Sequence, residues 1–350
     1  MRARGVVVAT LGVALLFLGC TARQQTQVVP ESRVPPTQKI RRDSLAVAGP
    51  EARVPAEQAA QRGSALPRPE RLIRECIRWP GQALDIDVAD LGTDGTEELF
   101  LLTADSVLVF SDAAKLSSFG LSAGCADWVS RNNIGAMVVD GATGTVYLNT
   151  SDLASGEVHR WNGVRFEDLH QPLSAFPVAL RPTDSGAEPI LKKWVPGTDY
   201  FVEKTTTFDD DLGERSETLY FYASASGDID ADQAGPEDIL LGLDGRITVY
   251  DEFFSLVQSD ERVFGDFARL FGTRLVVTSA RALGEGDYCV VLQWEGGEWV
   301  EVHRSRDYAG PLVSAALGDL DRDGQDELVL AEQAGTPERP LTIIHLDTWP

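Results

Sequence analysis

The sequence of 350 residues lacks the short motifs that mark many catalytic sites. It contains no HExxH metalloprotease motif, no phosphate-binding P-loop, no CxxC pair and no dinucleotide-binding glycine fingerprint. Its four histidines, His159, His170, His303 and His345, are not spaced as metal ligands. We therefore expect a protein that is not an enzyme.

Basic residues are scarce beside acidic ones. The chain has 31 Lys+Arg against 54 Asp+Glu, a net charge of −23. Residues 1–71 carry a net charge of +6, so residues 72–350 carry −29. A body this acidic argues against nucleic acid as a partner. It suits a protein that binds cations or basic surfaces, or one that simply stays soluble.

The N-terminal apolar run, Val6–Leu18, is only 13 residues long, which is short for a membrane-spanning helix. Arg2 and Arg4 precede it, so residues 1–20 read as a targeting segment. The run ends at Gly19-Cys20, which resembles a bacterial lipoprotein signal, with Phe17 where leucine is usual.

That resemblance implies that Cys20 is the first residue of the mature chain and carries the lipid. With Thr21-Ala22 and no aspartate after it, it also implies the outer membrane, on the periplasmic or surface face of the cell envelope. An ordinary secretory signal cleaved near Ala22 is the alternative.

Residues 21–71 are rich in proline, glutamine, alanine and arginine and show no sustained apolar period. Such a segment buries too little surface to offset its ordering entropy, so we predict a flexible linker.

From residue 72 onwards the sequence changes to short apolar or alternating runs broken by Gly, Asp and Asn. Runs of this kind at short spacing predict strands of an all-β fold, and no long helical period appears. The clearest runs cover residues 106–110, 135–139, 144–148, 217–222, 246–250, 274–278, 288–292 and 341–345.

The stretch Gly318–Leu330, GDLDRDGQDELVL, has the most specific pattern in the chain. Asp319, Asp321 and Asp323 occupy alternate positions, Gly324 allows a sharp turn, and an apolar run follows. Such alternation lets carboxylates wrap a hard cation, and the pattern adds a backbone carbonyl at position 7 and a closing acid at position 9. We therefore predict a calcium site with the ligands Asp319, Asp321, Asp323, Gln325 and Glu327. The alternative is an Asp-rich turn that caps its own backbone amides without metal.

The same pattern occurs twice more in weaker form. The first copy has its acids at Asp90, Asp94 and Glu98, with Gly92 at position 3. The second copy is stretched by two residues, and its predicted ligands are Asp228, Asp230, Asp232 and Asp238. Both copies run into an apolar strand, so the turn is an internal repeat, and we expect both to bind calcium more weakly.

The pattern GDxDxDGxxDLxV resembles the FG-GAP/VCBS-type repeat of integrin α N-terminal domains and of many bacterial secreted proteins. The resemblance covers residues 72–350 in outline and implies a β-propeller with calcium turns at blade edges. Six repeat positions are spaced by 37–54 residues, near the ~40–50 residues of known propeller repeats. Six blades are therefore favoured, seven are possible, and a pair of β-sandwiches is the structural alternative. The positions are Asp90, Asp127, Arg181, Asp228, Asp266 and Asp319.

A propeller must close its ring, or strand edges stay exposed. The C-terminal run 341–346 ends soon after one strand, and residues 72–79 precede the first repeat position. We predict that these two segments pair.

Three cysteines remain beside Cys20. Cys76 and Cys125 flank the first repeat, and a disulfide between them could stabilise the fold by roughly 4 kcal/mol. Cys289 alternates with apolar neighbours and is expected to be a buried free thiol.

Two weaker patterns in the sequence suggest a catalytic serine and a sugar-binding face. Gly120–Gly124 spells GxSxG around Ser122, but no helical pattern follows, so we interpret it as a loop rather than a nucleophile elbow. Several tryptophans could line a sugar-binding face, although packing between blades is the favoured role.

The sequence thus predicts a lipid-anchored envelope protein whose propeller binds or scaffolds a protein or polysaccharide. A propeller-fold enzyme such as a polysaccharide lyase is the alternative.

Overall fold

The computed structural model describes residues 74–350, except 93, 112–113, 123–133, 184–185, 197, 199, 210–212, 231–235, 281–285 and 337–338. All of them belong to the second of the two units into which the chain divides, Leu66–Pro350. They form 23 strands, which confirms the all-β prediction. Within these residues no helix is long and apolar enough to cross a membrane. The predicted signal peptide, Cys20 and the linker lie outside the described residues.

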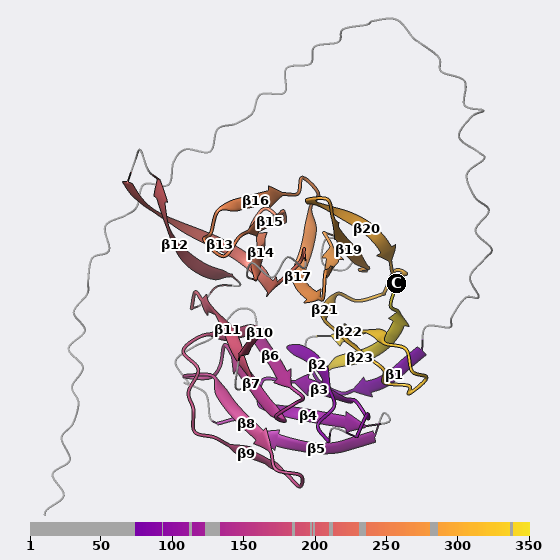
Figure 1. Cartoon of the computed structure of the whole chain (residues 1–350). Coiled ribbons are helices and arrows are strands. Elements are labelled where there is room, and N and C mark those ends of the chain that lie inside the picture. Colours follow the sequence, from indigo (N-terminus) through magenta and orange to yellow (C-terminus); the bar gives the residue numbers. More distant parts are fainter. Residues whose placement is uncertain are drawn as a thin grey trace, which may run out of the picture. The chain divides into compact units, whose positions relative to one another are not determined.

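The strands form four sheets of four antiparallel strands and one sheet of seven (Figure 1). The first sheet contains β2 (Asp85–Ala89), β3 (Glu98–Leu102), β4 (Ser106–Ser111) and β5 (Ala114–Gly120). The second contains β6 (Gly135–Asp140), β7 (Thr145–Thr150), β8 (Glu157–Trp161) and β9 (Phe166–Asp168).

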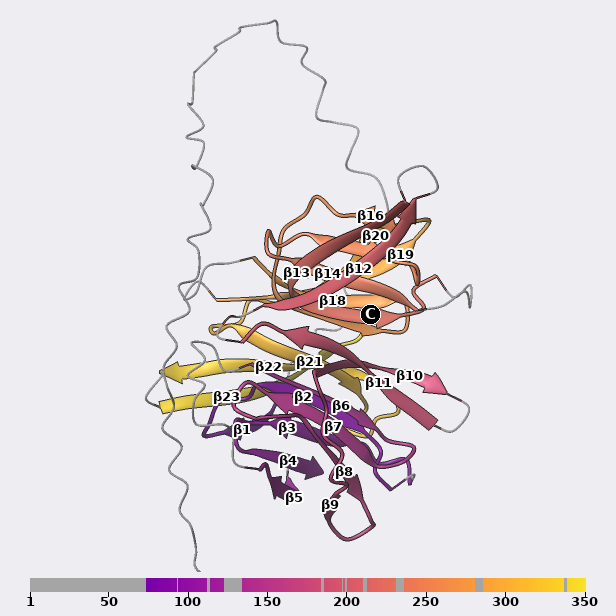
Figure 2. The same ribbon diagram turned by 90° about the vertical axis from the view of Figure 1, so that its left-hand side faces the viewer.

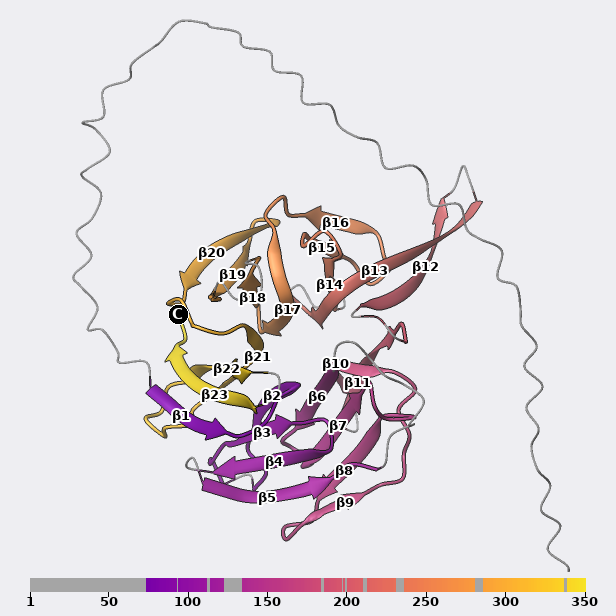
Figure 3. The ribbon, with the colours of Figure 1, turned by 180° about the vertical axis from the view of Figure 1, so that it is seen from behind.

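The seven-stranded sheet is joined by one long strand. It contains β10 (Phe176–Thr183), β11 (Gly186–Trp194), β12 (Phe201–Asp209), β13 (Gly213–Gly227), β14 (Glu237–Gly242), β15 (Ile247–Tyr250) and β16 (Leu256–Ser259). The first half of β13 pairs with β12 and its second half pairs with β14. In Figures 1 and 3 the β12–β13 hairpin reaches outwards beyond the other strands.

The last two sheets complete the chain. One contains β17 (Phe264–Phe271), β18 (Arg274–Ser279), β19 (Cys289–Glu295) and β20 (Glu298–Arg304). The other contains β21 (Leu312–Gly318), β22 (Glu327–Thr336), β23 (Arg339–Thr348) and, from the far end of the described chain, β1 (Arg74–Trp79).

The sheets are arranged around a common centre, which is lined by inner strands, and the unit is a β-propeller. Among the described residues the inner strands follow the order β2, β6, β10, β13, β17 and β21, and each contacts the next. Strand β21 in turn contacts β2 and completes the ring (Figure 3). Figure 2 shows the β10–β11 pair beside β6 and β7, in agreement with the contacts of β10 with both.

The ring closes as predicted. Strand β1 pairs with β23 in antiparallel register, from Arg74 opposite Leu346 to Trp79 opposite Thr342. This pairing covers the edge of β23 with a strand from the other end of the unit, and so removes an exposed row of backbone donors and acceptors. The predicted pairing of residues 72–79 with 341–346 is confirmed for residues 74–79, and residues 72–73 lie outside the described residues.

The core lies between neighbouring sheets, which explains the unbroken apolar runs. On β3, Leu99 and Leu101 pack towards the closing sheet, whereas Phe100 and Leu102 pack towards the second sheet. All four side chains are at most 1% exposed. Successive side chains of a strand point to opposite faces, so a strand covered on both faces needs apolar residues at every position. Burying each side chain contributes about 1.5–3 kcal/mol.

Candidate metal centre

The turn after β21 winds around the carboxylate of Asp319. Its Oδ1 accepts a hydrogen bond from the backbone N–H of Asp323 at 2.9 Å, and its Oδ2 accepts one from Gly324 at 2.8 Å. Asp323 Oδ1 in turn accepts a hydrogen bond from the N–H of Gln325 at 3.0 Å. Gly324 has φ of 84°, a left-handed conformation that glycine adopts at little cost. The alternating acids are thus ordered by their own backbone.

Four acids of this turn converge. Asp319, Asp321, Asp323 and Glu327 each offer one carboxylate oxygen, and these oxygens lie within 4.8 Å of one another. Calcium holds its oxygen ligands at about 2.3–2.6 Å, so two ligands of one ion lie at most about 5 Å apart. The residues present therefore fit a calcium ion. A role for the Gln325 carbonyl stays a prediction.

Electrostatics in the turn also favour a cation. Glu327 is buried, and this burial together with the charges of Asp321, Asp319 and Asp323 raises its pKa from 4.5 to about 7. A carboxylate among three others is destabilised in its ionised form unless a positive charge compensates. A bound divalent cation would supply that charge.

The turn after β13 forms a second cluster, with one correction. Asp228 and Asp230 converge with Glu237. The predicted closing acid Asp238 instead pairs with the buried Lys192 at 2.8 Å. Glu237 and Asp238 are neighbours in β14 and therefore point to opposite faces, so only one of them can close the turn. The predicted ligand Asp232 lies outside the described residues.

The turn after β2 shows similar capping hydrogen bonds but no such cluster among its described residues. Asp90 accepts hydrogen bonds from Gly92 at 3.0 Å, from Asp94 at 3.3 Å and from Gly95 at 2.8 Å. Among the described residues, Asp90, Asp94 and Glu98 do not gather within 4.8 Å, and Gly92 at position 3 supplies no further acid. This turn matches the alternative of backbone capping, and calcium binding there stays a prediction.

One contact is common to the three turns and was missed from the sequence. In each turn the closing acid is the first residue of the following strand and accepts a hydrogen bond from the N–H at position 2. The pairs are Glu98 with Leu91 at 3.1 Å, Glu237 with Ile229 at 3.0 Å, and Glu327 with Leu320 at 3.2 Å. The closing acid is thus the first residue of the following strand in all three turns. By this criterion the closing acid of the turn after β13 is Glu237.

A polar cluster where the inner strands meet was also missed. Asp85 on β2 accepts a hydrogen bond from the N–H of Met137 on β6 at 2.8 Å and pairs with Arg269 on β17. Asp87, on the same face, accepts a hydrogen bond from the N–H of Val139 at 2.8 Å. Burial raises the pKa of Asp87 to about 6, although Arg269 opposes this shift. These contacts join inner strands of different sheets and stabilise the ring.

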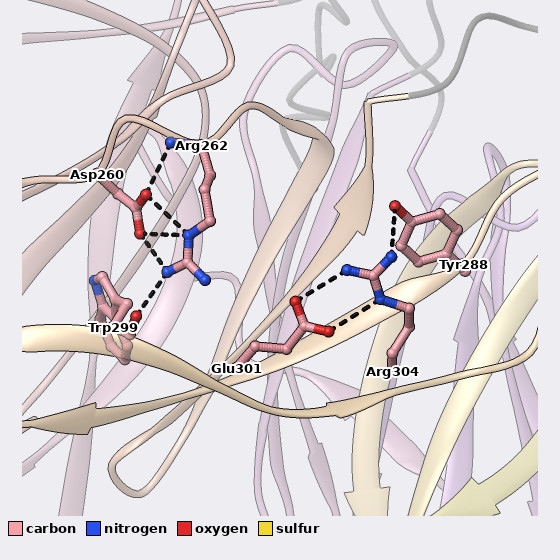
Figure 4. Close-up of polar contacts among 6 residues, drawn as sticks. All are labelled: Asp260, Arg262, Tyr288, Trp299, Glu301 and Arg304. Atoms are coloured by element: carbon pink, nitrogen blue, oxygen red, sulfur yellow. Dashed lines mark hydrogen bonds and ion pairs between the residues drawn. The ribbon is translucent and has the colours of Figure 1, made fainter. Parts of the chain in front are cut away.

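Figure 4 shows a further polar group beside β20, formed by Asp260, Arg262, Tyr288, Trp299, Glu301 and Arg304. Arg262 pairs with Asp260 and donates to the carbonyl oxygen of Trp299 at 2.7 Å. Arg304 pairs with Glu301 at 3.0 Å. The Arg262 contacts link the loop after β16 to β20, whereas the Arg304–Glu301 pair lies within β20.

Two of the remaining predictions fall on described residues. Cys289 is a buried free thiol, as predicted, and burial raises its pKa to about 12. The Ser122 hydroxyl donates to the carboxylate of Glu157, which also contacts His159 at 2.8 Å. The residues that would form the helix of a nucleophile elbow, 123–133, lie outside the described residues, so the loop interpretation of Ser122 stays a prediction. Cys125, the predicted partner of Cys76, lies outside the described residues.

Comparisons with known proteins give the following likenesses. No family model matches the chain, and no curated protein matches it. The chain is similar to BBS1N, solved in complex with ARL6DN, at 10% identity and a TM-score of 0.40, covering 79% of this chain and 97% of that one. It is similar to the Dos1 propeller at 10% identity and a TM-score of 0.38, covering 80% and 76%. A chain of the mitotic checkpoint complex matches at 9% identity and a TM-score of 0.41, covering 87% and 100%.

Proposed function

We propose that this protein is an envelope lipoprotein whose propeller is a calcium-stabilised binding module of the FG-GAP/VCBS type. The observation that carries the proposal is the convergence of Asp319, Asp321, Asp323 and Glu327 in one turn. This turn connects β21 to β22 in the sheet that closes the ring, so a bound ion stabilises the closing sheet. Calcium would supply the positive charge that these four carboxylates lack.

The partner in this proposal is a protein or a polysaccharide at the cell envelope. The lipid on Cys20 holds the propeller at the membrane, and the linker of residues 21–71 lets it reach that partner. An acidic propeller body favours a partner with basic groups, because opposite charges steer association.

Calcium titration of the full chain in detergent tests the metal. Extracellular calcium modules bind at about 10⁻⁴–10⁻³ M, so isothermal titration at millimolar calcium should give saturable binding. Asp321→Ala should abolish most of this heat, and Glu298→Ala, on an exposed strand of another sheet, serves as the control. A wild-type protein without saturable heat contradicts the calcium site.

Membrane fractionation tests the anchor. Cys20→Ser should move the protein from the membrane fraction to the soluble fraction and block maturation. An unchanged distribution contradicts the lipoprotein proposal. Pull-down from envelope fractions with wild-type bait, with and without chelator, then separates a protein partner from a polysaccharide one.

A further inference from the structure

Glu97 belongs to the first turn, but its side chain reaches the last one. Its Oε2 accepts a hydrogen bond from the backbone N–H of Asp319 at 2.5 Å, across 222 positions of the sequence. Burial raises the pKa of Glu97, and the N–H of Asp319 opposes that shift. Asp319 therefore makes two kinds of contact. Its carboxylate accepts hydrogen bonds within the turn Asp319–Glu327, here called the cation turn, and its backbone N–H donates to Glu97, which lies just before β3 of the first sheet.

Gly318 makes this contact possible. A Cβ atom at this position would lie 2.4 Å from Glu97 Oε2 and 2.4 Å from Val88 Cγ1. Real Cβ atoms do not approach other atoms so closely, so any larger residue would displace the Glu97 carboxylate or the inner strand β2. The glycine before Asp319 is thus explained by a close approach of the first sheet.

Other contacts join the same two regions. Arg322 Nη2, in the last turn, donates to Ser111 Oγ at the end of β4 at 3.3 Å. Ser314 on β21 donates to Asp85 on β2 at 2.5 Å. The last turn and the first sheet therefore meet at the seam where the ring closes.

We propose that Glu97 is a positioning residue for the cation turn, so that cation binding at Asp319–Glu327 strengthens ring closure. This inference rests on the proposed calcium site. A bound cation restricts the backbone of Asp319 and so favours the conformation that presents its N–H to Glu97. Coupling between two equilibria is reciprocal, so the Glu97 contact must raise calcium affinity by the same factor by which calcium strengthens the contact.

Four variants of the full chain distinguish the effect of the Glu97 charge from that of its hydrogen bond with Asp319. The calcium affinity of each variant is measured by titration with calcium alone. Glu97→Gln removes the charge but keeps an acceptor oxygen, whereas Glu97→Ala removes both. Asp326→Asn and Asp326→Ala are the matched controls, because Asp326 is an exposed acid in the last turn whose charge also acts on Glu97. We expect Glu97→Ala to bind calcium about fivefold more weakly than Glu97→Gln, and the two Asp326 variants to bind alike.

Hydrogen exchange supplies a readout that does not depend on affinity. In the wild type, calcium should slow amide exchange both in the turn after β21 and in the paired strands β1 and β23. In Glu97→Ala at saturating calcium, only the turn should remain protected, and Glu97→Gln should restore protection of β1 and β23.

The two proposals fail in different ways. Suppose that the wild type binds calcium, that Glu97→Ala and Glu97→Gln bind it equally, and that exchange in β1 and β23 is the same in both variants. This result overturns the role of Glu97 and leaves the calcium site standing. A wild type that binds no calcium overturns both.

Discussion

The turns after β2 and β21 share capping hydrogen bonds and differ, among other positions, at position 3. Both have an aspartate at position 1 that accepts N–H bonds, and Gly95 and Gly324 occupy position 6 with φ of 80° and 84°. Position 3 is Gly92 in the first turn and Asp321 in the last, and only the last turn gathers its acids into a cluster. The comparison teaches that backbone capping and the gathering of acids are separable, because the capped turn forms without the third acid.

The largest expected effect comes from the turn after β13, where Glu237 and Asp238 have different roles. Asp238→Ala leaves the buried Lys192 with Glu203 as its one ion partner among the described residues, so we expect a loss of about 3 kcal/mol in unfolding free energy. The loss should be equal with calcium and with chelator, as measured by urea denaturation. Glu237→Ala is the matched control, and its effect should depend on calcium. A calcium-dependent loss in Asp238→Ala would return that residue to the ligand set.

The second effect separates the last turn from the first. At calcium tenfold above the dissociation constant, one site stabilises the fold by about 1.4 kcal/mol. Chelator should therefore lower the melting temperature by about 3 °C. Asp321→Ala should remove most of this response, and Asp90→Ala should remove little of it. Equal losses in the two variants would mean that the turns bind alike, and a melting curve indifferent to calcium would leave both as capping structures.

The third effect is a pH dependence that calcium removes. Without a cation the pKa of Glu327 is raised from 4.5 to about 7, so the folded state binds a proton more tightly than the unfolded state. Unfolding free energy in chelator should then fall as pH rises from 4.5 to 7, on the order of 1 kcal/mol after screening. With saturating calcium Glu327 is ionised in the folded state, as it is in the unfolded state above pH 4.5, so this fall should disappear. Glu327→Gln should flatten the curve in chelator, and a wild-type curve in chelator that rises with pH contradicts this assignment.

The smallest effect tests whether the first turn lacks only its third acid. Gly92→Asp restores that acid, and a Cβ at Gly92 meets its nearest neighbour, Asp94, at 3.4 Å, an ordinary contact. If the new site binds tenfold more weakly than the last turn, the same calcium concentration equals its dissociation constant and adds about 0.4 kcal/mol. Calcium titration of Gly92→Asp in an Asp321→Ala background should detect the gain, and Gly92→Asn is the uncharged control. No gain would show that residues beyond position 3 separate the turns.

Local patterns in the sequence determined much of the candidate site. Residues 319–327 lie in one loop, so the spacing of the three aspartates, Gly324 and Glu327 is enough to bring four acids together. The apolar run after the loop likewise predicts a strand covered on both faces, and the structure places β22 between two sheets. The pairing of residues 74–79 with 341–346 could also be predicted, because a closed ring of strands needs a partner for its last edge.

Only the tertiary structure decided the contacts between distant segments. Spacing predicts Asp238 as the closing acid, but strand register directs Glu237 to the turn and Asp238 to Lys192. The contact of Glu97 with Asp319 spans 222 positions, and that of Asp85 with Met137 spans 52. The spacing of apolar residues along a strand shows which face of that strand is buried, because alternate side chains point to the same face. It does not report which side chain of another sheet lies opposite, because that depends on how the sheets pack around the ring.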